Sequence, residues 1–356
     1  MHAVGADQVE EAVADCVAAL GAVVDRDWTG VRAGRLEWDC RETAVHIASD
    51  LIAYAGQLAG RAQDAYVPFE IALDEGTDNA GALQTIGATG ALLAAAVRTT
   101  PRAVRAFHPY PFRHANREGF AAMGIAEVLL HTHDIAEGMG IGYEPPAGLA
   151  SFVLTRIFPR VQPGPTPWRT LLWATGRGEL PGREPVTGWK WNNNLVIPAE
   201  RLTLEGVTPA VAADLAVGGE GGFDWLGPGP FEGTRTAAGM LLKQYEEGAF
   251  RPEWGMFVLV RREDDRAVGG MGFHRAPDEN GRVEIGYDLT EAARGNGYAT
   301  EALRALSAWA LGHEEVTSVY ARTDPDNLPS QAVITRAGFT RTEDGDEDEF
   351  AYELRG

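Results

Sequence analysis

The sequence predicts two domains, a bundle of four helices followed by an α/β domain built on a mixed sheet. With 356 residues, the chain is long for a single hydrophobic core. Apolar residues recur at helical spacing through residues 1–140, whereas stretches typical of strands begin after Glu200. We therefore expect a helical domain with its tail in residues 1–180, a linker in 181–196 and an α/β domain in 197–356.

Four segments of the N-terminal part are predicted to be helices long enough for a four-helix bundle. They span residues 7–24, 41–59, 79–97 and 116–138, and a further helix is expected over 147–158. Asp39 or Thr43 can cap the second segment. The stretch 180–188 is rich in Pro and Gly, which is typical of a linker. Trp189 and Trp191 beside it nevertheless indicate that this connection packs against something.

The C-terminal part alternates between strands and helices. Strands are expected over residues 201–206, 255–262, 268–274, 282–289, 316–322 and 350–354, with helices over 233–247 and 330–337. Strands with interspersed helices are typical of a mixed α/β sheet.

Composition excludes several classes of function. The formal net charge of −20 argues against a nucleic-acid-binding surface, which needs a basic stripe, and against docking on an anionic membrane. A cationic substrate such as an amine would be steered favourably. Two cysteines, Cys16 and Cys40, are too few for a disulfide framework and fit a reducing compartment. Because no leader and no membrane-spanning apolar run is evident, we expect a cytoplasmic protein.

A glycine-containing turn lies between a strand and an amphipathic helix in the C-terminal part. It reads Ala293-Arg-Gly-Asn-Gly-Tyr-Ala-Thr-Glu301, and the strand 282–289 precedes it. Gly295 and Gly297 allow a tight bend, and the first amides of the following helix lack partners within the helix. Helix N-termini favour anions, so the amides of residues 294–299 are candidates to bind a pyrophosphate. Many turns with two such glycines only cap a helix, so this pattern by itself decides little.

The residues around this turn resemble the GNAT acetyltransferase superfamily. Arg294-Gly-Asn-Gly-Tyr-Ala299 fits its coenzyme-binding signature, and Glu284-Ile-Gly-Tyr287, Asn327-Leu-Pro-Ser330 and Arg336-Ala-Gly-Phe339 follow the family's order and spacing. The resemblance is to the branch that acetylates the N-termini of ribosomal proteins and small amines. It implies a mostly antiparallel mixed sheet and acetyl-CoA as a cosubstrate. The implied activity is N-acetylation of a primary amine, either a small molecule or a peptide N-terminus, by direct attack.

The same resemblance implies roles for individual residues. It implies that the strand Ile285–Leu289, with Tyr287, splays from its neighbour to admit the pantetheine arm, and that Asn327 bonds this arm. The pyrophosphate is expected at Arg294, Gly295, Asn296, Gly297, Tyr298 and Ala299. Glu284 is the candidate general base and Ser330 the candidate proton donor, for which Tyr287 or Tyr298 can substitute. Each also has a structural alternative: an exposed strand residue for Glu284, a helix start for Ser330 and core packing for the tyrosines.

A second candidate site lies in the helical domain. Glu127 and His131 are four residues apart and share one helix face, which an earlier helix carrying His46 can oppose. Two imidazoles and a carboxylate can hold Zn²⁺ or another divalent ion, with Asp134 orienting His131. The alternative is three hydrogen-bonded polar residues in a helical core.

Residues Trp38–Leu51 and Gly124–Asp134 resemble the mycothiol-dependent maleylpyruvate isomerase group of DinB-like bundles. In that family the metal ligands fall on the positions of His46, Glu127 and His131. The resemblance implies metal binding and leaves two further alternatives open. The domain is either a mycothiol-dependent isomerase or transferase, with the C-terminal half auxiliary, or a binding or dimerising module without catalysis, so a homodimer is one open arrangement.

Overall fold

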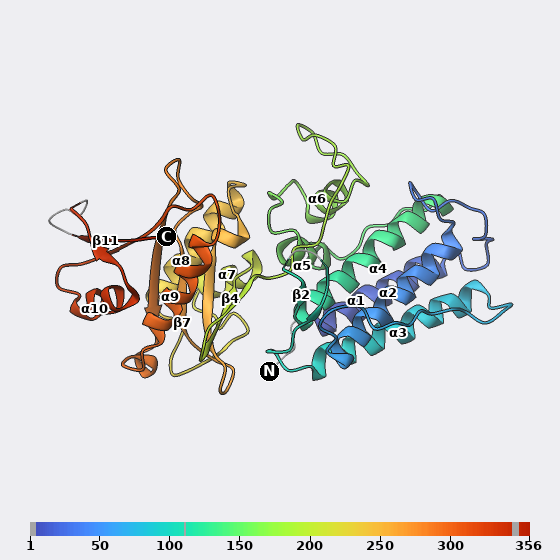
Figure 1. Cartoon of the computed structure of the whole chain (residues 1–356). Coiled ribbons are helices and arrows are strands. Elements are labelled where there is room, and N and C mark those ends of the chain that lie inside the picture. Colours follow the sequence, from blue (N-terminus) through green and yellow to red (C-terminus); the bar gives the residue numbers. More distant parts are fainter. Residues whose placement is uncertain (1–4, 110–111, 344–348) are drawn as a thin grey trace. The chain divides into compact units, whose positions relative to one another are not determined.

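The computed structural model of the chain describes residues 5–109, 112–343 and 349–356 (Figure 1). The chain divides into two compact units, unit 1 from Met1 to Asn193 and unit 2 from Asn194 to Gly356. The predicted first domain also includes residues 1–4, which lie outside the described residues.

Unit 1 is helical, as the spacing of its apolar residues predicts. Its long helices are α1 (Ala6–Gly21), α2 (Cys40–Gly60), α3 (Asn79–Thr99) and α4 (Arg117–Met139). A short antiparallel pair, β1 (Ala106–Phe107) and β2 (His114–Ala115), precedes α4, and α5 (Ala147–Ile157) and α6 (Pro167–Ala174) follow it. Side chains fix three helix starts: Asp39 caps α2, Asp78 caps α3 and Asn116 caps α4, each by accepting a first-turn amide.

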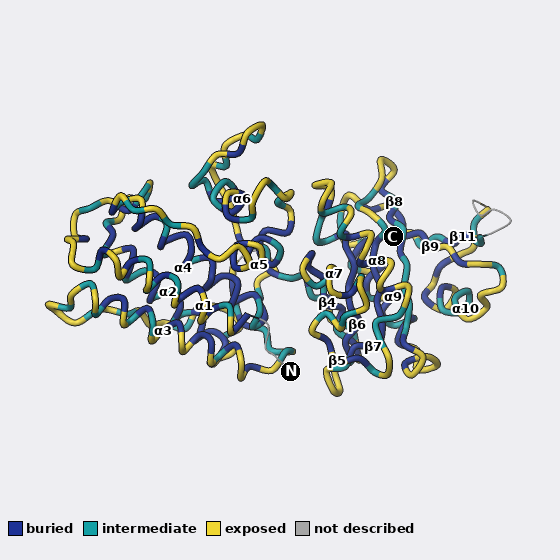
Figure 2. The backbone as a smooth tube through the Cα atoms, turned by 180° about the vertical axis from the view of Figure 1, so that it is seen from behind, coloured by how far each residue is buried: buried dark blue, intermediate teal, exposed yellow. Residues whose placement is uncertain are grey.

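Helix α4 is the centre of unit 1. It packs against α1, α2 and α5, and most of its length is buried, as the dark blue tube shows in Figure 2. Among the described helices, α3 alone has the length and apolarity of a membrane span. Its Ile86, Leu93 and Val97 are fully buried in the core of unit 1. Helix α3 thus buries its apolar side chains inside unit 1, as a core helix does.

Residues 181–193, which make up most of the predicted linker, belong to unit 1. The Trp173 indole donates to the Glu184 carbonyl, and the Asn192 amide donates to the Ile157 carbonyl. Trp191 is only 8% exposed and contacts Phe158 and Trp189 edge-on. Burial of the Trp191 and Phe158 rings outweighs the local Pro/Gly composition, so the unit extends to Asn193.

Unit 2 is a mixed sheet with helices on both faces. Its elements are β3 (Val196–Pro198), β4 (Leu202–Gly206), α7 (Pro209–Ala216), β5 (Asp224–Trp225), α8 (Glu232–Glu246), η1 (Pro252–Trp254), β6 (Met256–Arg261), β7 (Arg266–Phe273), β8 (Arg282–Leu289), η2 (Glu291–Ala293), α9 (Tyr298–Leu311), β9 (Ser318–Thr323), α10 (Leu328–Ala337), β10 (Thr340–Arg341) and β11 (Phe350–Arg355). The strand order is β10-β11-β9-β8-β7-β6-β4-β3, with β5 beside β7. The β8–β9 and β5–β7 pairs are parallel, and the other pairs are antiparallel.

The alternation of side chains along β6 separates two cores. Met256, Val258 and Val260 pack with residues of α7 and α8, whereas Phe257 and Leu259 pack with residues of α9. Helices α7 and α8 therefore cover one face of the sheet and α9 covers the other.

The parallel pair β8–β9 is incomplete. Its register joins Arg282 to Ser318, Val283 to Val319 and Glu284 to Tyr320, and no pairing between the two strands continues beyond Glu284 in the described part of the chain. Both strands run on, since β8 reaches Leu289 and β9 reaches Thr323. The sheet therefore opens between β8 and β9, on the side toward the N-terminus of α9.

Candidate functional site

The turn before α9 has the conformation that its glycines allow. Gly295 and Gly297 have φ angles of 78° and 79°, in the left-handed region that side chains with a Cβ rarely adopt. The Asn296 side-chain amide donates to the carbonyls of Ala293 and Arg294 and so closes the turn. Residues 294–297 are exposed, so a ligand can reach the turn.

Most of the expected amide donors are available. The Arg294 amide donates to the Glu291 carbonyl, so it does not belong to the predicted set of pyrophosphate donors. Within the described residues, the amides of Gly295, Asn296, Gly297, Tyr298 and Ala299 have no acceptor in the chain. These donors converge at the positive end of a helix of 14 residues. That arrangement can bind the phosphates of a nucleotide.

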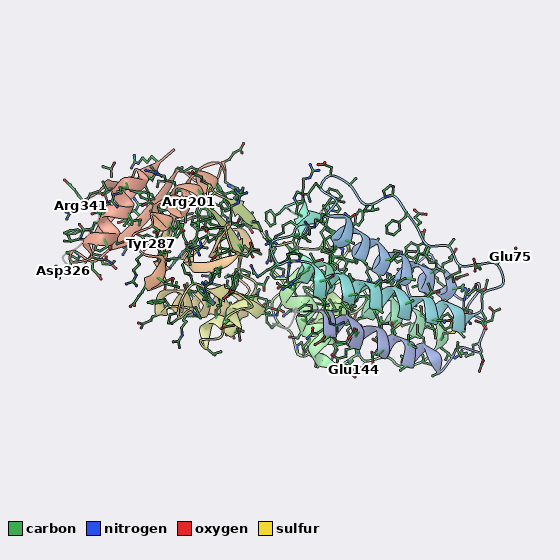
Figure 3. The ribbon with its side chains drawn as sticks, turned by 90° about the horizontal axis from the view of Figure 1, so that it is seen from below. Glu75, Glu144, Arg201, Tyr287, Asp326 and Arg341 are labelled. Carbon is green, nitrogen blue, oxygen red and sulfur yellow. The ribbon has the colours of Figure 1, made fainter. Side chains whose placement is uncertain are left out.

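Two arginines border the turn. Arg201 donates to the Asn296 carbonyl at 3.0 Å, pairs with Glu301 of α9 at 2.8 Å and lies over the Tyr298 ring. Arg294 lies over the Phe231 ring, with 5.4 Å between the guanidinium carbon and the ring centroid. Figure 3 labels Arg201, together with Tyr287 of β8. Arg201 therefore holds the turn against β4 and adds positive charge beside it.

A cavity of about 740 Å³ lies on the α8 face of the sheet. Its walls come from α8, β6, β7, the opened part of β8 and the segment between β9 and α10. Gly286 and Tyr287 line it on one side of the opening, and Asp324 and Asn327 line it on the other. The cavity therefore adjoins the gap between β8 and β9.

The candidate proton donors meet at this opening. The Tyr287 hydroxyl lies 2.9 Å from the Ser330 hydroxyl, and the Asn327 side chain caps α10 by accepting the Ser330 amide. Burial raises the pKa of Tyr287, although the bond to Ser330 lowers it in part. Tyr287 therefore remains protonated at neutral pH, as a proton donor must.

The candidate base Glu284 lies between two cationic or titratable partners. Its Oε1 is 3.4 Å from Nδ1 of His274 and 3.7 Å from Nε of Arg322. The hydrogen bond from His274 lowers the pKa of Glu284 against the opposing effect of burial. A carboxylate that is stabilised in its charged form takes up a proton less readily.

The other predicted residues of unit 2 lie in the framework. Tyr298 is 7% exposed, and its ring contacts Arg201. Its contacts thus differ from those of the Tyr287–Ser330 pair. Ile285 and Leu289 pack into the α9 core, and Ala299 is buried on the first turn of α9.

Comparison with known proteins agrees with this architecture. Residues 201–340 match the family model described as an acetyltransferase (GNAT) domain. Unit 2 contains a GNAT acetyltransferase domain.

Relatives of the GNAT domain are known at the level of sequence and structure. The uncharacterized N-acetyltransferase YjdG of Bacillus subtilis (strain 168) is 41% identical over 83 residues, which cover 23% of this chain and 49% of that protein. The uncharacterized N-acetyltransferase p20 of Bacillus licheniformis is 29% identical over 112 residues, 32% of this chain and 62% of its own length. A solved acetyltransferase from Agrobacterium tumefaciens str. C58 matches over 49% of this chain and 100% of its own, with 24% identity and a TM-score of 0.34. The chain thus spans about half the length of the first of these relatives.

Unit 1 brings together the three predicted metal ligands. One ligand atom from each of His46, Glu127 and His131 lies within 4.8 Å of the others. His131 Nε2 is 3.1 Å from Glu127 Oε2, and His46 Nε2 is 4.0 Å from the same oxygen. The three side chains line a cavity of about 390 Å³ with Trp38, Arg177 and Trp189. This donor set suits Zn²⁺ or a similar divalent ion.

The remaining ring nitrogen of His131 is held by Asp134. His131 Nδ1 lies 3.0 Å from Asp134 Oδ2, and Arg177 binds both oxygens of that carboxylate. Burial lowers the pKa of His131, but the bonds to Asp134 and Glu127 outweigh it and raise that pKa to about 9. Burial and the charge of Glu127 raise the pKa of Asp50, which lies 3.1 Å from His46 Nε2, to about 8.

Sequence reasoning gave no role at these sites to three residues: Arg201, Asp50 and Arg177. For His274 it favoured a structural role over that of a base. Asp50 follows His46 by one helical turn, a spacing that could have indicated its place. Arg177 is 43 residues from Asp134, and Arg201 is 95 residues from Asn296. No local pattern connects residues so far apart in the chain.

Proposed function

We propose that the GNAT domain is an acetyl-CoA-dependent N-acetyltransferase that acetylates a primary amine by direct attack. The observation that carries this proposal is the opening between β8 and β9, which begins at Glu284 and runs toward the unpaired amides before α9. Acetyl-CoA held at these amides by its diphosphate would extend through the opening, so that its thioester would reach the cavity on the α8 face.

The diphosphate is assigned to the amides of residues 295–299, with positive charge from Arg294 and Arg201. The pantetheine arm is assigned to the opening beside Ile285, Tyr287 and Leu289, with Asn327 on its far side. This placement leaves the cavity between α8 and the sheet for the acceptor.

The lining of the cavity favours a cationic acceptor. Among the described residues, Glu232, Asp288 and Asp324 line it and no lysine or arginine does. An ammonium group is attracted by such carboxylates and gives up a proton before its nitrogen attacks. Both a small amine and a peptide N-terminus satisfy this requirement.

The chemistry has three parts that these residues can supply. A backbone amide of the opened part of β8 polarises the acetyl carbonyl. The acceptor nitrogen attacks the carbonyl carbon, and the carbon–sulfur bond breaks. Ser330, bonded to Tyr287, protonates the departing thiolate, and a base in the cavity wall takes the acceptor's proton.

Binding and turnover test this function separately. Calorimetry of the full chain with acetyl-CoA should give binding with one coenzyme per chain. A thiol-release assay over alkyl diamines, benzylamine and peptides with free N-termini should give acetylated product that mass spectrometry identifies. If acetyl-CoA fails to bind, the assignment of the α9 turn is wrong.

A second candidate function, metal binding by His46, Glu127 and His131, is supported by the convergence of their donor atoms in unit 1. An ion there would act as a Lewis acid or activate a bound water. A mycothiol-dependent isomerase or transferase would use such an ion together with a thiol, and a binding or dimerising module would use it without catalysis.

Elemental analysis of the purified chain tests metal binding. We expect close to one divalent ion per chain, which Glu127→Ala and His131→Ala should remove. His133→Ala is the matched control, because His133 is on the same helix, is not one of the three ligands and pairs with Glu137 at 3.9 Å. Loss of metal in the control as well as in the ligand variants would show that helix damage, and not ligand removal, releases the ion.

A further inference from the structure

His274 and Glu284 form a cross-strand pair at the edge of the cavity. His274 directly follows β7, and its amide donates to the Glu284 carbonyl of β8 at 2.9 Å, so the two residues lie opposite each other. Phe273 and Ile285 point to the α9 core, so His274 and Glu284 share the opposite, α8 face. On that face Nδ1 of His274 lies 3.4 Å from Glu284 Oε1.

The other nitrogen of the imidazole lies over the opened strand. A Cβ added to Gly286 would stand 2.9 Å from His274 Nε2. Gly286 is two residues beyond the point where β8 leaves β9, and both Gly286 and His274 line the cavity. The missing side chain of Gly286 therefore leaves the space in which the imidazole lies, next to the expected thioester channel.

We propose that His274 is the general base of the acetyl transfer and that Glu284 is its positioning residue. The proposal rests on the function proposed above for the GNAT domain. His274 Nε2 takes one proton from the acceptor ammonium and later releases it to water. The neutral nitrogen bonds to the carbonyl carbon, the carbon–sulfur bond breaks, and the thiolate receives a proton from Ser330 or Tyr287. The nitrogen of the product loses its second proton to water, and the donor, Ser330 or Tyr287, regains a proton from water.

The geometry favours His274 over Glu284 as the group that meets the amine. The Oε1 atom of Glu284 already lies near His274 and Arg322. The imidazole has one nitrogen toward this carboxylate and the other toward the cavity, an arrangement that fixes the ring and its tautomer. The charged groups around it are Glu284, the Arg322 and Arg275 side chains that act on Glu284, and Asp288 and Asp324 in the cavity wall.

Steady-state kinetics of the full chain test the proposal with whichever amine or peptide probe from the panel is acetylated. His274→Gln should lower kcat by about 10²-fold or more and remove the acidic limb of the pH–rate profile. Its affinity for acetyl-CoA, measured by calorimetry, should equal that of the wild type, which also shows that the domain is folded.

Glu284→Gln should lower kcat less than His274→Gln does and leave the KM for the acceptor unchanged, because the imidazole stays in the cavity wall but loses the carboxylate that orients it. Added imidazole should restore part of the activity of His274→Ala. The control is His313→Gln, whose ring bonds the Trp309 carbonyl and does not line the cavity. It should keep the wild-type rate.

The outcomes distinguish a failure of the proposed acetyltransferase function from a failure of the assignment of His274 as base. If the wild type acetylates no probe and binds no acetyl-CoA, the proposed function fails. If the wild type is active and His274→Gln keeps its kcat and its pH profile, the proposed function stands and the assignment of His274 as base is overturned. An abolished acidic limb in Glu284→Gln, with His274→Gln unaffected, would make Glu284 the base.

Discussion

Gly297 has a backbone conformation that a residue with a Cβ adopts only with strain. Its φ of 79° places it in the left-handed region, and it directly precedes the first turn of α9. Gly297→Ala should destabilise unit 2 by about 1 to 2 kcal/mol, because a Cβ clashes with the following carbonyl in that region. Since relaxation of the turn would also misplace the amide donors, acetyl-CoA affinity measured by calorimetry should fall.

Gly239 provides the matched control for this substitution. It lies inside α8, and nothing is within 4 Å of a Cβ built on it. Gly239→Ala should therefore stabilise the domain by about 0.5 to 1 kcal/mol and leave coenzyme affinity unchanged. If the two substitutions changed acetyl-CoA affinity equally, that affinity would not depend on the conformation of the turn at Gly297.

Arg201 links β4 to the turn by a bond to the Asn296 carbonyl and an ion pair with Glu301. Its side chain is 47% exposed, so solvent screens the ion pair and Arg201→Ala should lower the free energy of unfolding by only about 1 kcal/mol. Coenzyme affinity should fall by about threefold to tenfold, which corresponds to up to about 1.4 kcal/mol.

Arg262→Ala is the charge-matched control for Arg201, because the Arg262 side chain bonds the carbonyls of Ala199 and Glu200. Titration calorimetry at two salt concentrations should give a weaker affinity for the Arg201 variant alone. An equal loss in both variants would assign the effect to net charge and not to the geometry of the turn.

At the scale of elements, the helices of unit 1 and most strands of unit 2 follow from the periodicity of the sequence. The expected helix 116–138 corresponds to α4, and the expected strand 282–289 corresponds to β8. The helix α7 and the short strand β5 were missed, because eight and two residues are too few to establish a period.

Sites follow less directly from the sequence than elements do. The sequence predicts a turn at residues 294–299 because the residues that form it are contiguous. The pair of His274 and Glu284 depends on the register of the β7–β8 hairpin, which joins Phe273 to Ile285. Periodicity gives the face of a strand but not the partner opposite each residue, so this pair became visible only in the fold.

The contact between β8 and α10 leads to a prediction about two hydroxyl groups, one on each element. Because the Tyr287 and Ser330 hydroxyls lie 2.9 Å apart, we expect them to act as one proton-donating unit. Tyr287→Phe and Ser330→Ala should each lower kcat with little change in acetyl-CoA affinity. The double variant should be no slower than the slower single variant, and steady-state rates of all three measure this. Independent, multiplying losses would assign the two hydroxyls to separate tasks.

At the scale of the whole molecule, the two units have separate hydrophobic cores. One core cluster contains residues of unit 1 only, and the two clusters on the faces of the sheet contain residues of unit 2 only. Residues that share a core unfold together, so each unit should behave as its own cooperative unit.

Scanning calorimetry of the full chain should therefore show two transitions with separate responses to ligands. Acetyl-CoA at about 100 times its Kd should stabilise folded unit 2 by about 2.7 kcal/mol, because it binds only the folded form, and should raise the midpoint temperature of that unit's transition. A divalent ion should raise the midpoint temperature of the transition of unit 1. Gly297→Ala should weaken the first response and His131→Ala should abolish the second, each without affecting the other. If both ligands raise a single transition together, unfolding of the two units is coupled despite their separate cores. The units would then have to be treated as one thermodynamic system when either site is studied.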